Sequence, residues 1–219
     1  GWDMSASGLA AVWAEDNTRE SILAALKRRE VYATSGPRIG LRFFAGDGYA
    51  QDILDSASLY QQAVAGGVPM GGELVGAREQ SPEFIVLAER DAIGANLDRI
   101  QIVKGWLDQQ GNTHERVYDA AWSGGRVIDA AGKLPAVGNT VDAGSASYEN
   151  SIGAPALSVR WEDPDFDPQQ SAFYYVRVLE IPTPRHSLYD AVALGQGGAE
   201  GHPDSIQERA YSSPIWYRP

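Results

Sequence analysis

The chain has 219 residues, of which 43% are hydrophobic, and its 18 basic and 29 acidic residues give a formal net charge of -11. This negative field repels the phosphates of nucleic acids and of anionic membranes, so we expect neither as a partner. The absence of cysteine excludes disulfides and thiolate metal sites. No apolar run approaches the roughly 20 residues that span a bilayer. We therefore expect a soluble protein of either the cytoplasm or the periplasm.

The first predicted element is a helix. Asn17 and Glu20 form a capping box before an apolar-periodic run, which predicts a helix over about 17–30. Its apolar face consists of Ile22, Leu23 and Leu26. A turn signal at 35–37 follows, and residues 39–44 are rich in the aromatic and β-branched residues of a strand.

Residues 45–82 have a less regular pattern. Apolar residues recur at helical spacing between 53 and 65, but glycine pairs at 66–67 and 71–72 interrupt the run. We expect an irregular connection with one short helix.

The rest of the chain alternates strand patterns with turn residues. Strands are predicted at 84–89, 99–106, 115–122, 157–161, 173–181 and 213–217. The segment 108–111, Asp-Gln-Gln-Gly, has the residues of a β-turn, and it is expected to join the second and third of these strands into a hairpin. Residues 173–181 are apolar on both faces, which is typical of a central strand. The fold class is therefore α+β and mainly β, an immunoglobulin-like antiparallel β-sandwich preceded by one helix.

An acidic segment offers one candidate cation site. Asp163, Asp165 and Asp167 alternate, and carboxylate oxygens are ligands for calcium. An EF-hand would need Gly and Glu where Pro168 and Tyr174 stand, so a turn between two strands is the favoured interpretation.

The histidines do not form a recognisable ligand motif. His114, His186 and His202 lie far apart in the sequence, so a surface role is favoured over a metal site. Trp106, Trp122 and Trp161 stand at strand positions. Core packing is favoured there over a sugar-stacking platform.

The connection at 182–190 follows the most apolar strand and is the candidate ligand loop. Its chemistry-bearing residues are Arg185, His186, Tyr189 and Asp190. Functional residues concentrate on loops that a rigid scaffold positions. The alternative is a surface loop held by two prolines.

Several segments together resemble one protein family. The chain is similar to the C-terminal part of bacterial proteins of the domain of unknown function 3604 family, relatives of the polymerase and histidinol phosphatase (PHP) metallohydrolases. The similar segments are "SGLAAVWAEDNTRESILAALKRREVYATSGPRI", "GVPMGGEL", "ANLDRIQIVKGWLD", "GKLPAVGNTVD", "DPDFDPQQSAFYYVRVLEIPTPR" and "IQERAYSSPIWY".

The resemblance implies a division of the chain and a role for it. Residues 1–44 would be the tail of a PHP-like barrel, 45–82 a connection and 83–219 the sandwich. The metal ligands of that superfamily would lie upstream, so the resemblance implies no cofactor and no catalytic residue in this chain, and divalent metals in the barrel. The expected function is a non-catalytic region that shapes or covers the active site of a metal-dependent hydrolase. The alternative is an independent binding module for a carbohydrate or protein partner.

This resemblance also suggests partners. The upstream barrel is the first, and the helix at 17–30 would pack against it. Without that barrel, the exposed apolar face of Ile22, Leu23 and Leu26 would favour a homodimer.

Overall fold

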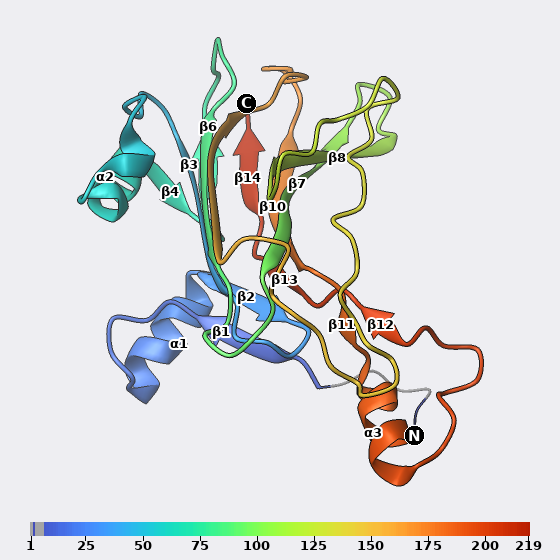
Figure 1. Ribbon diagram of the computed structural model, residues 1–219. Coiled ribbons are helices and arrows are strands. Elements are labelled where there is room, and N and C mark those ends of the chain that lie inside the picture. Colours follow the sequence, from blue (N-terminus) through green and yellow to red (C-terminus); the bar gives the residue numbers. More distant parts are fainter. Residues whose placement is uncertain (1, 3–6) are drawn as a thin grey trace.

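Alternating apolar residues build two large β-sheets, which the computed structural model describes for residue 2 and residues 7–219 (Figure 1). The strands are β1 (Leu9–Val12), β2 (Val31–Thr34), β3 (Gly40–Gly46), β4 (Gly67–Pro69), β5 (Glu73–Val75), β6 (Glu83–Glu89), β7 (Leu97–Leu107), β8 (Thr113–Trp122), β9 (Ala156–Glu162), β10 (Ala172–Glu180), β11 (Thr183–Pro184), β12 (Ser205–Ile206), β13 (Arg209–Ser212) and β14 (Ile215–Arg218). The helices are α1 (Arg19–Lys27), α2 (Leu59–Gly66), α3 (His186–Leu194) and the short 3-10 helix η1 (Ile53–Asp55). The mainly β prediction is confirmed.

The larger sheet has eight strands. Its order is β1-β2-β13-β10-β14-β5, and β7 pairs with both β10 and β8. Strand β10 is central, because β7 lies along one side while β13 and β14 share the other. The pairs are antiparallel except β14 with β5. The smaller sheet has the order β4-β3-β6-β9, and β11 pairs with β12.

The two sheets share one hydrophobic core. Residues of β3 and β6, such as Phe43 and Phe84, belong to the same buried cluster as Ile102, Tyr174 and Val176 of the larger sheet. Burial of apolar area at this interface supplies the main driving force for folding. A second cluster under α2 covers the other face of the smaller sheet through Phe44 and Ile85.

Each of the two large sheets combines strands from more than one of the segments 1–44, 45–82 and 83–219 that the resemblance implies. Strands β1 and β2 join the larger sheet through β13, whereas β3 is central in the smaller sheet. Residues 1 and 3–6 of the first segment lie outside the described residues.

Helix α1 is shorter than predicted. Thr18, not Asn17, is the N-cap, and its Oγ1 accepts from the Ser21 amide at 3.3 Å. The helix ends in a Schellman motif, since Glu30 N donates to Ala25 O while Arg29 adopts a left-handed φ of 61°. Glycine or asparagine usually takes that position, so the sequence carries no stop signal there.

The predicted helix at 53–65 is two elements. Ser56 is extended between η1 and α2. The hydroxyls of Ser56 and Ser58 each accept from the Gln62 side chain at 2.8 Å. Serine hydroxyls at such positions compete with continuous helix formation.

In the part of the chain that the structure describes, no helix is long and apolar enough to cross a membrane.

Candidate ligand-binding face

Strand β10 separates two faces of the larger sheet. Tyr174, Val176 and Val178 are fully buried in the shared core. The alternate residues Phe173 and Tyr175 are half-buried and point to the other side of the sheet. We call this second side the outer face.

The outer face carries a row of four aromatic rings. The centroids of Trp216 and Phe173 are 5.3 Å apart, those of Phe173 and Tyr175 are 6.4 Å apart, and those of Tyr175 and Tyr211 are 6.4 Å apart. The row runs along β10, with Trp216 of β14 beside Phe173 at one end and Tyr211 of β13 opposite Arg177 at the other. We call these four residues the aromatic row.

A groove of about 620 Å³ opens at the Trp216 end of the aromatic row. Trp106 and His114 form a stacked pair in its wall, with centroids 5.2 Å apart. Thr113, Glu115, Ser171 and Arg218 add polar groups to the lining. Aromatic surface with a few polar groups is the usual composition of a small-molecule site.

Gly105 shapes this groove. It lies opposite Phe173 in the register, and a Cβ atom at this position would be 2.3 Å from Cζ of the Phe173 ring. Only glycine therefore lets the ring of Phe173 lie across β7.

Two arginines stand at the Tyr211 end of the aromatic row. Arg177 lies opposite Tyr211, and Arg209 is two residues before it on β13. Burial raises the pKa of Tyr211, but the guanidinium groups of Arg209 and Arg177 outweigh it, and the pKa is lowered. We call Arg177 and Arg209 the arginine pair.

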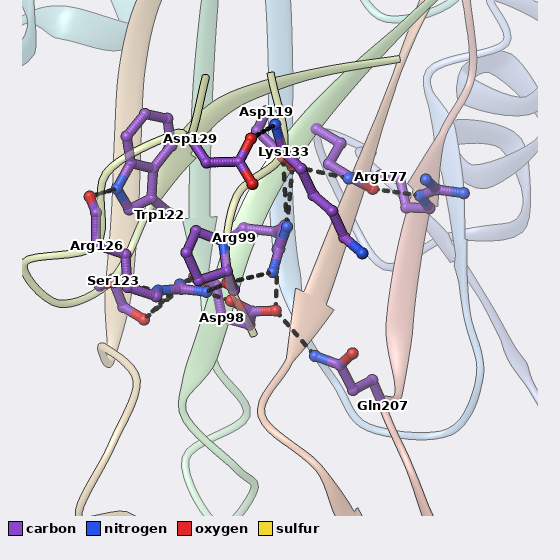
Figure 2. A network of polar contacts seen from close by, with 12 residues as sticks. Asp98, Arg99, Asp119, Trp122, Ser123, Arg126, Asp129, Lys133, Arg177 and Gln207 are labelled. Atoms are coloured by element: carbon purple, nitrogen blue, oxygen red, sulfur yellow. Dashed lines mark hydrogen bonds and ion pairs between the residues drawn. The ribbon is translucent and has the colours of Figure 1, made fainter. Parts of the chain in front are cut away.

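A buried polar network supports the outer face near these arginines (Figure 2). Asp98, with 1% of its surface exposed, accepts from Arg99 Nε at 3.0 Å and from Gln207 Nε2 at 2.9 Å. Its other oxygen lies 2.6 Å from Arg126. Arg99 also pairs with Asp119 at 3.3 Å, so two arginines face two carboxylates, and the network is a structural anchor of β7 and the loop after β8.

The acidic segment at 163–167 forms an ion pair with a lysine of the same chain. Lys104 Nζ lies 2.5 Å from Asp163 Oδ2, and both side chains are buried. Tyr174 also donates to Asp163, at 2.8 Å. Asp165 is bound by Arg116 at 2.7 Å, while Asp167 accepts from the Gln169 amide. Asp163 and Asp165 share the Tyr118 hydroxyl, at 3.3 and 2.8 Å, so groups of the protein itself occupy these two carboxylates.

The candidate ligand loop is helical for most of its length. Helix α3 begins at His186, and Gly195 ends it with a left-handed φ of 63°. Leu188 and Ala191 pack inward at helical spacing, a pattern that the sequence contains. Arg185 is buried and donates to Ser187 Oγ at 2.7 Å. Tyr189 is exposed. The Asp190 carboxylate accepts a hydrogen bond from the Trp2 indole. Helix α3 lies at the other end of the molecule from the C-terminus of β14 (Figure 1).

The histidines lie on separate elements. His114 is in β8 and binds Asp108 at 2.9 Å, His186 opens α3, and His202 precedes β12. Within the described ranges, 2 and 7–219, no three His, Cys, Asp or Glu residues are grouped as a metal site would require.

The three tryptophans of the sequence prediction are all half-buried. Trp106 and Trp161 pack against the shared core. Trp122 donates to Arg126 O at 2.7 Å. The aromatic row itself was not predicted from the sequence, although Phe173 and Tyr175 stand at alternate positions of one predicted strand.

One buried carboxyl group lies apart from these features. Glu180 is the last residue of β10, and 2% of its surface is exposed. Its Oε1 has no hydrogen-bond partner among the described residues. Burial raises the pKa of Glu180 to about 8, with further contributions from Glu208 and Asp91.

Comparisons with known proteins place the chain in one family. No curated protein and no solved structure matches it. A family model described as "Protein of unknown function (DUF3604)" matches residues 1–219. The chain therefore belongs to the DUF3604 family.

Proposed function

We propose that this chain is a non-catalytic binding region that takes up a carbohydrate on its outer face. The observation that carries the proposal is the aromatic row, which leads from the 620 Å³ groove along β10 and includes residues of β13 and β14. The four rings are half-buried in the chain alone, and adjoining aromatic rings that keep part of their surface accessible are typical of an interaction site.

The groove favours a sugar over a purely apolar ligand. A pyranose ring presents polarised C–H bonds on its faces, which suit the negative faces of aromatic rings. Its hydroxyls need hydrogen-bond partners at the ring edge, and Thr113, Glu115 and Ser171 supply them in the groove lining. A nucleic acid could also stack on these rings, but its phosphates would meet the net charge of -11.

Isothermal titration with neutral xylo-, cello- and manno-oligosaccharides tests this proposal. We expect one of these series to bind and Tyr175→Ala to weaken binding at least about tenfold, by analogy with nucleobases, whose stacking on an aromatic side chain is worth about 1–3 kcal/mol. Tyr189→Ala is the matched control, since Tyr189 is an exposed tyrosine on α3, away from the outer face. Equal affinity of Tyr175→Ala and wild type, or no binding in any series, would refute the proposal.

A second candidate function is the accessory region of a PHP-like metal-dependent hydrolase. An apolar groove between α1 and strands β1, β2 and β13 favours it, because such a surface suits a protein partner. Leu23 and Leu26 beside it are 49% and 51% exposed. In this proposal the partner is the catalytic barrel, which would hold the divalent metals, α1 is its last helix, and the two sheets form an immunoglobulin-like sandwich.

This second function is tested by metal analysis and ester hydrolysis. We expect divalent metal and turnover of phosphomonoesters or phosphodiesters only in a longer protein that joins this chain to a barrel domain. Stoichiometric metal and hydrolysis by the chain alone would refute it. A dimer in light scattering that Leu26→Lys dissociates would instead assign the groove at α1 to a second copy.

A further inference from the structure

The positive charges at one end of the aromatic row have no carboxylate partner in the part of the chain that the structure describes. Among residue 2 and residues 7–219, neither Arg177 nor Arg209 forms an ion pair with a carboxylate. The neighbouring Arg99, by contrast, is bound by Asp98 and Asp119. The arginine pair therefore places two uncompensated positive charges on the outer face of a protein whose net charge is -11.

The side chains of the arginine pair are held by neutral oxygen atoms. Arg177 Nε donates to Gln101 Oε1 at 2.7 Å, and Gln101 is in turn fixed by Asp119 at 2.8 Å. Arg209 donates to Gln207 O from Nε at 3.2 Å and from one terminal nitrogen at 3.1 Å. Figure 2 shows Arg177 at the margin of the polar network. Each guanidinium group keeps donors for an additional acceptor, since arginine has five N–H bonds.

The position of the arginine pair relative to the rings defines the ligand further. Phe173 and Arg177 are four residues apart on β10, which corresponds to about 13 Å along a strand. That is the length of a short oligosaccharide. Arg177 and Arg209 occupy diagonal cross-strand positions, so both can reach the same anionic group.

We infer that the outer face binds a sparsely acidic glycan, with neutral sugar rings on the aromatic row and a carboxylate of the glycan between Arg177 and Arg209. This inference rests on the proposed carbohydrate-binding function. Arginine suits a carboxylate because its planar fork donates two parallel hydrogen bonds. The acidic groups must be sparse, because the net charge of the protein repels a dense polyanion.

Two oligosaccharides that differ by one acidic group test the inference. The probes are xylotetraose and xylotetraose with a single glucuronic acid branch, measured by isothermal titration. We expect the branched probe to bind at least about tenfold more tightly than the neutral one, since a hydrogen bond to a charged group supplies such a difference. Arg177→Gln and Arg209→Gln should each reduce the difference in affinity between the two probes to less than about twofold, because each removes one of the two charges that would bind the carboxylate.

The control variant is Arg19→Gln, an exposed arginine on α1 without a carboxylate partner among the described residues. It should keep the preference for the branched probe. Raising the salt concentration should weaken binding of the branched probe alone, because only that probe pairs charges.

The titration of Tyr211 gives a second readout. Because the arginine pair lowers the pKa of Tyr211, an anion between the two guanidinium groups should raise that pKa again. The Cζ resonance of Tyr211, assigned with Tyr211→Phe, should report this change with the branched probe and not with the neutral one. Arg177, Arg209 and Tyr175 are the charged or titratable groups beside it.

The outcomes separate the two proposals. Equal binding of both probes, with binding still lost in Tyr175→Ala, overturns the acidic ligand and leaves the carbohydrate proposal in place. Failure of both probes and of the neutral series used above overturns both. Binding of the branched probe that Arg177→Gln does not change overturns the position of the carboxylate.

Discussion

The two faces of β10 differ in how their charged groups are paired. On the inner face, Tyr174 donates to Asp163, whose charge is matched by buried Lys104. On the outer face, Arg177 has no carboxylate partner among the described residues, and its Nε donates to the neutral Gln101. A charge matched inside the protein serves the folded state, whereas a charge left with a neutral partner can still serve a ligand. In the proposed function, alternate residues of this one strand therefore have separate roles, one in stability and one in binding.

Removal of the Asp163 carboxylate should have the largest effect on the free energy of unfolding. Asp163→Ala leaves Lys104 buried without its counter-charge, so we expect a loss of about 3–5 kcal/mol in the free energy of unfolding. Urea unfolding followed by circular dichroism measures it. Asp167→Ala in the same segment is the control, and it should cost about 1 kcal/mol because it removes only one turn hydrogen bond.

A double variant sharpens this prediction. Lys104→Met with Asp163→Leu removes both charges together, and it should recover most of the stability that Asp163→Ala loses. If the double variant is as unstable as Asp163→Ala, the loss comes from packing and not from the unpaired ammonium group.

The inner face also has one carboxyl group that is not matched, at Glu180. Its pKa in the folded state is raised from 4.5 to about 8, mainly by burial. The folded state therefore favours the proton, so this contribution to stability is complete below pH 4.5 and is lost as the pH rises through 8. The loss is about 1.4 kcal/mol for each pH unit in that window.

Urea unfolding of wild type and Glu180→Gln between pH 5 and pH 8 checks this sign. We expect the stability of wild type to fall with pH and that of Glu180→Gln to change much less. Glu79→Gln, at an exposed position, should retain the slope of wild type. A wild-type curve that rises over this window would contradict the prediction.

The sequence contains the alternation that builds these faces, but not the partners across them. The strands predicted at 99–106 and 173–181 are confirmed as β7 and β10, because period-2 alternation and turn residues are local signals. The partner of Asp163 is Lys104, and the neighbour of Phe173 is Trp216. Those contacts depend on long-range register, which no local pattern specifies.

The same limit applied to the candidate site. The prolines at 182 and 184 predict a loop at 182–190, and loops often carry functional residues, yet the apolar spacing of this segment and Gly195 produce the helix α3. An aromatic residue at a strand position can lie either in the core or on the surface of the protein, and the sequence alone does not distinguish the two. The aromatic row becomes visible only when β13 and β14 are placed beside β10.

Gly105→Ala should disturb the outer face and leave the inner one intact. The new methyl group overlaps the Phe173 ring, which must leave β7, so we expect a loss of about 1–3 kcal/mol in stability. Because the displaced ring closes part of the groove, oligosaccharide binding should also be lost. Gly125→Ala, where a Cβ atom meets nothing within 4 Å, is the control for both unfolding and titration measurements.

The smallest effect on stability is expected at the arginine pair, and it decides whether the two faces differ in purpose. Arg177→Gln breaks no ion pair among the described residues, and glutamine can still hydrogen-bond Gln101, so the free energy of unfolding should change by less than about 0.5 kcal/mol. Urea unfolding beside titration with the glucuronic acid probe measures both properties in one variant. A loss of stability comparable with that of Asp163→Ala would show that Arg177 holds the sheet together, and its unmatched charge would then be no sign of a ligand. Full stability with a lost preference for the acidic probe would assign Arg177 to binding, because a residue that serves only the fold cannot change selectivity without changing stability.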